Sequence, residues 1–241
     1  MKKIIIFLFF LVVSNIYSQS DKDIFDKAII LYNNGSYEEA LTNFKVLLSK
    51  GYSNFEIYYN IGCCYFKLKK YGFSRFYFEK ALIYKPFDKD LFQNLYVLYN
   101  KILKNPELGI QEIMTKRVIY FIPLWILMIF FILTFLVIVV MIIILFNFVN
   151  LRKIAMILIS IFIFLNLVTA FIFFLQYAEF NKKAFVVTST TNVYLTPNED
   201  NIIFSVLEGT KGTFKEEFGN FVKVNLSDGT SGWIKKDFIV Y

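Results

Sequence analysis

The chain has 241 residues, of which 57% are hydrophobic, and its mean hydropathy is +0.53. This apolar content exceeds what a soluble domain buries, so part of the chain is expected to face lipid. The formal net charge is +7 but Lys and Arg form no dense run, which argues against nucleic-acid binding, and the absence of His excludes His-based triads, metal sites and proton shuttles.

The first segment in chain order, residues 1–18, has the pattern of a secretory signal peptide. Lys2 and Lys3 form a basic start, and residues 4–13 form an apolar run that is too short to span a membrane comfortably. We therefore expect the part that follows to be exported, whether the segment is cleaved after Ser18 or kept as an anchor.

Residues 21–105 contain a repeat with a period of 34 residues. Shifting residues 28–47 forward by 34 positions places them on residues 62–81, where aromatic and small residues recur at the same offsets. The equivalent pairs are Leu31 with Tyr65, Tyr37 with Tyr71, Ala40 with Ser74, Phe44 with Phe78 and Leu47 with Ala81. This pattern is typical of tetratricopeptide repeats, in which paired helices stack into a concave binding surface. Two repeats are expected, followed by an unpaired capping helix over residues 89–103.

Capping residues mark the expected helix boundaries in this region. Ser36 predicts a capping box at the second helix, Asn54 or Ser53 begins the third helix, and Asp88 begins the fifth. Gly35 is expected to adopt the left-handed conformation that ends the first helix.

The concave surface of the array is the predicted binding site. The first helix of each pair lines this surface, and its outward side chains suit an extended or helical peptide. These groove residues are Phe25, Ile29, Tyr32, Asn33, Tyr59, Cys63, Phe66, Lys67, Gln93, Val97 and Asn100. Phe25, Tyr59 and Phe66 are the expected anchors for a partner, with little part in packing between the helices. The alternative is that some groove residues fill gaps or pack against the segment next to the membrane.

Cys63 and Cys64 are the two cysteines of the chain. Neighbouring residues on a helix point about 100° apart, and a disulfide between them would be strained. A buried thiol at Cys64 and a half-exposed thiol at Cys63 are therefore favoured over a redox pair. Without His or a CxxC spacing, no metal site or cofactor is predicted. The adjacent acidic pairs fit solvated faces, so we expect no enzyme activity.

Two uncharged apolar segments, residues 118–146 and 154–177, follow the repeats. Each exceeds the roughly 20 residues that cross the hydrocarbon core, and a short turn with Arg152 and Lys153 separates them. We expect a transmembrane hairpin with this turn in the cytoplasm and both flanking domains outside it. Asn166 is expected to hold the hairpin together through a hydrogen bond. A channel or transporter subunit is disfavoured, because two helices without charges make a poor pore.

Residues 184–241 have the pattern of a small all-β barrel. Residues 221–234 are expected to form a hairpin in which Asp228 and Gly229 supply the positive φ angles of a tight turn. The short runs rich in Val, Ile and Phe that predict strands are residues 185–187, 202–207, 221–226 and 232–234.

This C-terminal segment resembles the bacterial SH3 family. The family's Asn-Val-Arg-x-x-Pro start, Gly-Thr turn and closing Asp-Gly-x-x-Gly-Trp-Ile/Val correspond to residues 192–197, 209–210 and 228–234. Tyr194 stands where the family has Arg, and Trp233 in this motif more often packs the barrel than binds a ligand. The resemblance implies an SH3-like barrel and an alternative function: binding of peptidoglycan or activation of a wall hydrolase.

The order of the segments resembles BatE-type proteins of the bacterial aerotolerance (Bat) operon. The likeness implies a multidomain membrane protein with an all-α repeat array, a two-helix transmembrane hairpin and a C-terminal SH3-like barrel. It implies a non-enzymatic scaffold in the bacterial inner membrane, with both folded domains on the periplasmic side. Its implied partners are membrane lipid and von Willebrand factor A-type Bat proteins, beside a MoxR-type ATPase. A redox-linked membrane protein using Cys63 and Cys64 is the other alternative.

Overall fold

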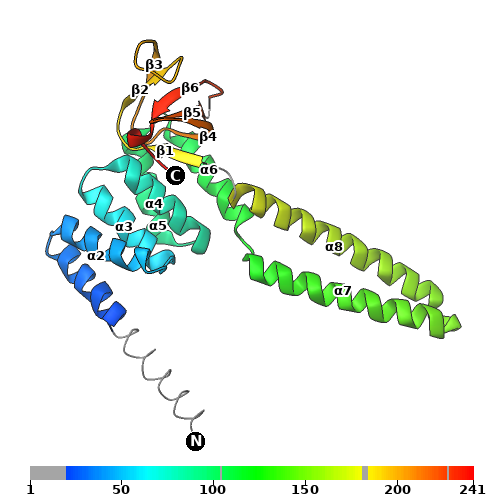
Figure 1. Cartoon of the computed structure of the whole chain (residues 1–241). Coiled ribbons are helices and arrows are strands. Elements are labelled where there is room, and N and C mark those ends of the chain that lie inside the picture. Colours follow the sequence, from blue (N-terminus) through cyan, green and yellow to red (C-terminus); the bar gives the residue numbers. More distant parts are fainter. Residues whose placement is uncertain (1–19, 104, 181–183, 227) are drawn as a thin grey trace, which may run out of the picture. The chain divides into compact units, whose positions relative to one another are not determined.

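The computed structural model describes residues 20–103, 105–180, 184–226 and 228–241 (Figure 1). The predicted signal peptide, residues 1–18, lies outside the described residues. The chain divides into two compact units. The first unit contains the described residues up to Gln111, together with those from Ala184 onward, and the second runs from Glu112 to residue 180.

The N-terminal part of the first unit is an all-α repeat region. The helices are residues 20–33, α2 (Tyr37–Ser49), α3 (Phe55–Lys67), α4 (Tyr71–Tyr84) and α5 (Lys89–Ile102), followed by α6 (Pro106–Ile119), whose residues from Glu112 onward belong to the second unit. The small residues of the repeat let these helices approach closely. A Cβ atom at Gly62 would overlap the Phe78 ring, and the Ser74 hydroxyl donates to the Gly62 carbonyl at 2.9 Å. At the equivalent positions of the first copy, Ala40 and Phe44 are fully buried.

Two of the predicted N-caps are confirmed. The Asn54 side chain accepts a hydrogen bond from the Ile57 amide at 3.0 Å, and the Asp88 side chain accepts one from the Leu91 amide at 2.9 Å. Both residues have the extended backbone that an N-cap adopts.

The predicted capping box at Ser36 is wrong. Its side chain makes no capping hydrogen bond with the residues that the structure describes. The preceding helix ends with Gly35 at a φ of +82°, as predicted, and the Ser36 amide donates back to the Leu31 carbonyl at 2.9 Å. Ser36 thus completes a Schellman motif of the helix before it, and the amide that a capping box needs is already used.

Helix α6 was not expected from the sequence. It follows the predicted capping helix α5, and its N-terminal half packs on it, because a side chain at Gly109 would overlap Tyr99 and Leu103. Helix α5 is therefore not the unpaired last helix of the array. Pro106 lies at the first position of α6, where its missing amide costs no hydrogen bond.

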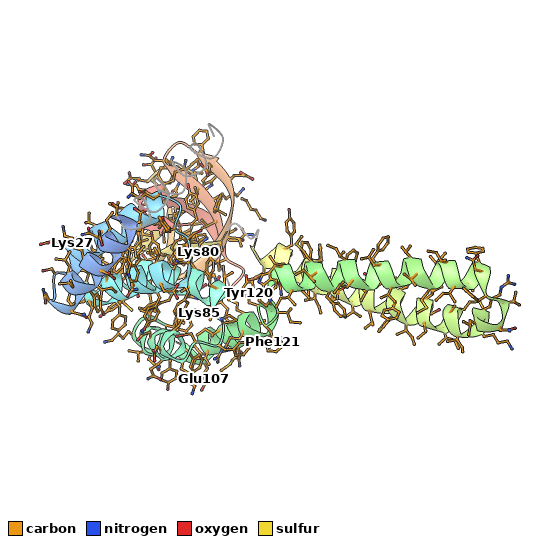
Figure 2. All side chains as sticks on the ribbon, turned by 90° about the horizontal axis from the view of Figure 1, so that it is seen from below. Lys27, Lys80, Lys85, Glu107, Tyr120 and Phe121 are labelled. Atoms are coloured by element: carbon orange, nitrogen blue, oxygen red, sulfur yellow. The ribbon has the colours of Figure 1, made fainter. Side chains whose placement is uncertain are left out.

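The second unit contains two long antiparallel helices, α7 (Leu124–Asn147) and α8 (Arg152–Phe180), joined by a 3-10 turn (Val149–Leu151) (Figure 1). Their most apolar windows have mean hydropathies of 3.5 and 2.7, and only 6% and 11% of these windows is buried. Figure 2 shows side chains projecting outward along both helices. Both helices are long and apolar enough to cross a membrane.

The polar residues of these two helices hydrogen-bond within the second unit. Thr134 donates to the Asn166 side chain at 3.2 Å, which confirms the predicted role of Asn166. Gln176, which the sequence analysis did not single out, is buried and donates to the Ile119 and Ile122 carbonyls at 2.6 and 2.9 Å. These carbonyls are available because the chain leaves the helical path between α6 and α7, ahead of Pro123.

The C-terminal part of the first unit is an antiparallel β-sheet, as predicted. Its strands are β1 (Ala184–Val187), β2 (Thr191–Tyr194), β3 (Ile202–Val206), β4 (Lys211–Phe218), β5 (Phe221–Leu226), β6 (Ser231–Lys235) and β7 (Ile239–Val240). The strand order is β3-β2-β6-β5-β4-β1-β7. Alternate residues of β5, namely Val222, Val224 and Leu226, point into a core shared with Phe185, Val193 and Ile234.

The predicted hairpin is formed by β5 and β6, which pair from Phe221–Lys235 to Asn225–Ser231. Its turn differs from the prediction, since among the described residues a positive φ occurs at Gly229 (+86°) and not at Asp228. The Asp228 carboxylate instead accepts hydrogen bonds from the Thr230 amide and hydroxyl at 2.9 and 2.6 Å. Asp228 therefore stabilises the turn through its side chain.

Candidate functional site

The predicted groove residues come from three helices of the repeat region: the first helix, α3 and α5. They differ in exposure. The half-buried ones are Phe25, Ile29, Tyr32, Tyr59, Cys63 and Phe66, and the exposed ones are Asn33, Lys67, Gln93, Val97 and Asn100. Most of the exposed groove residues lie on α5. Helix α5 therefore presents most of the side chains that can contact a partner.

The three expected anchors also pack between helices, which corrects the expectation that they take little part in packing. The Phe25 ring lies edge-on to Phe44 with a centroid distance of 5.6 Å. The Tyr59 ring stacks on Phe55 of the same helix at 5.4 Å, and it lies 5.9 Å from the Phe78 ring of α4. Phe66 meets an aromatic ring of α4 edge-on as well. The reason is that each half-buried ring lies at the edge of the seam between two helices, where one side of the ring packs on the core and the other side faces solvent.

A polar contact joins α3 to α5 at the same place. The Asn94 side-chain amide donates to the Tyr59 hydroxyl at 2.8 Å and lies 3.9 Å from the Cys63 sulfur. Gln93 is among the predicted groove residues, whereas Asn94 is not. A signal was available, because Asn94 lies three residues after Leu91 and four before Leu98, both buried. A polar residue on the buried face of a helix needs a hydrogen-bond partner.

Burial controls the chemistry of the two cysteines. Both thiols are free, and burial raises the pKa of Cys63 and of Cys64 to about 12. Burial, with a smaller contribution from the nearby Cys63, also raises the pKa of Tyr32 and of Tyr59. Reactive cysteines require a lowered pKa, because the thiolate is the nucleophile. The local environment thus opposes the alternative of a redox pair.

Metal chemistry finds no support in the described part of the chain. Within residues 20–103, 105–180, 184–226 and 228–241, no group of three or more Cys, Asp and Glu side chains could hold a metal ion. What the groove offers a ligand is aromatic edges, amides and one exposed Lys. Such a surface can bind a polypeptide through stacking and hydrogen bonds.

Comparison with known families agrees with this geometry. The chain matches the tetratricopeptide repeat family over residues 55–88, which contain α3, α4 and the connection to α5. No curated protein matches the chain. The matched segment is the second copy of the 34-residue period. The chain therefore carries a tetratricopeptide repeat, a kind of module that is typically non-catalytic and binds other proteins.

Proposed function

We propose that this protein is a non-enzymatic membrane adaptor whose repeats bind a partner protein in the concave surface. The observation that carries the proposal is the matched repeat together with the exposed groove residues on α5. The division of roles follows the predicted segments. Residues 21–105 recognise the partner, residues 118–146 and 154–177 anchor the protein, and residues 184–241 form an SH3-like module.

The contact between the repeat region and the C-terminal sheet supports a membrane hairpin. These two parts precede and follow α7 and α8 in sequence, yet they belong to one unit and hydrogen-bond to each other. A chain that leaves and rejoins the same folded unit must cross the bilayer an even number of times. Both modules then lie on one side, and the export pattern of residues 1–18 favours the periplasmic side of a bacterial inner membrane. Arg152 and Lys153, at the start of α8, would lie on the cytoplasmic side.

The similarity of segment order to BatE-type proteins of the aerotolerance operon supports a specific set of partners. On this proposal the repeats bind von Willebrand factor A-type Bat proteins, and the system serves stress tolerance or envelope integrity. The hairpin binds membrane lipid, and neither a cofactor nor a nucleic acid takes part.

One observation favours a second ligand on the C-terminal sheet. Trp233 is half-buried and pairs with Lys223 across β5 and β6, on the face opposite the buried Val222 and Val224. The Lys223 ammonium lies 5.8 Å from the Trp233 ring centroid. The strand register turns Trp233 away from the core that contains Val222, Val224 and Ile234. An aromatic ring beside a Lys could contact peptidoglycan or a second protein.

The adaptor proposal is tested with a matched pair of exposed valines. Val97 lies on α5 in the groove and is 36% exposed, whereas Val46 lies on α2, outside the predicted groove, and is 40% exposed. Tagged full-length protein carrying Val97→Asp or Val46→Asp is purified from membranes, and co-purified proteins are quantified by mass spectrometry. We expect Val97→Asp to release the partner, because a buried unpaired carboxylate is costly. Val46→Asp should retain it.

Retention of every partner by Val97→Asp would overturn the assignment of the groove. If Trp233→Ala then releases the partner, the C-terminal sheet is the binding module. Recovery of von Willebrand factor A-type proteins would support the BatE-type role, whereas wall hydrolases would support the alternative.

A further inference from the structure

The C-terminal sheet caps a helix of the repeat region. Helix α4 begins after Lys70, whose side chain makes no capping hydrogen bond with the described residues. The Gly72 amide in its first turn instead donates to the Glu208 carboxylate at 2.7 Å. A side chain at position 72 would overlap the Val187 carbonyl and Thr188, so glycine is required for the sheet to come this close. A carboxylate at a helix N-terminus is favoured by both the free amides and the helix dipole.

An ionic cluster extends this contact along α4. The Glu79 carboxylate, about 10% exposed, accepts hydrogen bonds from Arg75 at 2.7 Å and from Lys211 of β4 at 2.6 Å. Arg75 is 4% exposed, and it also donates to the Gly209 carbonyl at 2.7 Å. These charges are paired, and removing one partner from such a cluster leaves the other uncompensated.

The cluster also includes α5. The Tyr99 hydroxyl donates to Glu79 at 3.1 Å, and the Arg75 guanidinium lies 4.8 Å from the Tyr99 ring centroid. A side chain at Gly209 would overlap Ile102, near the end of α5. The loop before β4, which contains Glu208 and Gly209, therefore packs against both α4 and α5. These contacts hold the two helices in a fixed relative position.

The same two helices hold the groove residue Tyr59 of α3. Its ring lies against Phe78, which is three residues after Arg75 on α4, and its hydroxyl accepts from Asn94, five residues before Tyr99 on α5. A change in the relative position of α4 and α5 must alter the contacts of Tyr59 and of its neighbour Cys63. No residue of the sheet has to touch the groove for this effect.

From these contacts we infer that the C-terminal sheet sets the geometry of the repeat groove, with Glu208 and Lys211 acting as positioning residues for partner binding. The inference rests on the proposed function, since it concerns the same groove. It assigns the sheet a role that is separate from any ligand of its own. Loss of the Glu208 contact with Gly72, or of the Lys211 contact with Glu79, should loosen the packing of α5 on α3. Neither change removes a side chain of the groove.

Cys63 provides a reporter of this movement that needs no partner. Full-length protein in lipid nanodiscs is treated with iodoacetamide at pH 8, and labelling of Cys63 and Cys64 is resolved by fragment mass spectrometry. The test variants are Glu208→Met and Lys211→Met. The control variants are Glu217→Met and Lys236→Met, which break a solvent-accessible ion pair of 2.8 Å in the same C-terminal part of the chain.

We expect each test variant to speed Cys63 labelling roughly tenfold, the size of coupling found between packed elements. Cys64, which is fully buried, should stay protected, and the control variants should label like the parent protein. Unchanged Cys63 labelling in both test variants would overturn the inference. Equal labelling of both cysteines would also contradict it, because the sheet would then support the fold of the repeats as a whole.

Cys63 labelling of the Glu208 and Lys211 variants, taken together with partner release by Val97→Asp, separates this inference from the proposed function. If Cys63 responds but Val97→Asp releases no partner, the sheet is coupled to the groove but the groove is not the partner site. If Val97→Asp releases the partner and Cys63 does not respond, the adaptor role holds and the positioning role is wrong.

Discussion

At the scale of single residues, the environment of Cys63 decides its chemistry. The thiol lies at the seam of α3 and α5, 3.9 Å from the Asn94 amide that donates to the Tyr59 hydroxyl. Removal from water disfavours the thiolate and raises the pKa of Cys63, and neither the hydrogen bond with Tyr59 nor the charge of the nearby Lys67 reverses this effect. Cys63 thus contributes to packing between α3 and α5, and its thiol is partly accessible to solvent.

This environment predicts a shifted pH dependence of alkylation. Because burial raises the pKa of Cys63 to about 12, its thiolate fraction at pH 8 to 10 is far below saturation. The labelling rate should therefore rise about tenfold per pH unit over this range, whereas an unhindered thiol with a pKa of about 8.5 levels off. Iodoacetamide kinetics with N-acetylcysteinamide, a thiol without a neighbouring charge, as the reference give the comparison. A plateau for Cys63 near pH 9 would restore the redox alternative.

Tyr59 should contribute to stability as well as to binding. Its ring lies 5.9 Å from the Phe78 ring of α4, so Tyr59→Ala removes part of the seam between α3 and α4. We expect a loss of about 2 kcal/mol, below that of a fully buried ring because Tyr59 is half-exposed. Tyr96→Ala, on an exposed ring of α5, should cost under about 0.5 kcal/mol. Urea unfolding of the full-length protein in detergent, followed by circular dichroism, measures both, and equal losses would contradict the packing role.

At the scale of helices and strands, local sequence rules succeed where one rule acts alone. Asn54 and Asp88 cap their helices because the side chain of each accepts a hydrogen bond from an amide in the first turn. Ser36 follows the same rule in sequence, but its amide closes the previous helix. Strand β4 was missed for a related reason. Its outer half, Lys215 to Phe218, is exposed on both faces and lacks the apolar alternation that predicts a strand.

The two kinds of cap should respond differently to mutation. Asp88→Ala removes a side-chain acceptor from the Leu91 amide and should cost about 1 kcal/mol. Ser36→Ala removes no capping hydrogen bond, so it should lower the free energy of unfolding by only a few tenths of the loss expected for Asp88→Ala. Chemical unfolding of the two variants side by side is the measurement. A large loss for Ser36→Ala would show that the side chain caps α2 in solution.

At the scale of the whole molecule, contacts between distant parts of the chain define the first unit. Helix α4 bonds to residues more than 130 positions away, on the far side of both apolar helices in sequence. The modules thus form one body, and a partner that binds the repeats is held next to the sheet.

The topology that follows can be tested by labelling from outside the cell. Lys27→Cys reports on the repeat region and Asn198→Cys on the C-terminal sheet, and both parent residues are exposed. A membrane-impermeant maleimide applied to spheroplasts should label both positions equally. Asn150→Cys, in the turn between α7 and α8, should react only after the membrane is permeabilised. Labelling of Lys27→Cys without Asn198→Cys would mean that the two modules lie on opposite sides.

The sequence alone determined the repeat period, the paired helices, the two apolar helices and the antiparallel sheet. These features depend on periodicity and composition within short windows, where each residue meets neighbours that are close in sequence. The anchors Phe25, Tyr59 and Phe66 were placed on the right helices, but their packing was not foreseen. Only the tertiary structure decided that Asn94 joins the groove, that Gln176 ties α8 to the segment before α7, and that Glu208 caps α4. Each of these contacts joins helices or strands that are far apart in sequence, and no local pattern encodes which distant carbonyl or amide will be left without a partner.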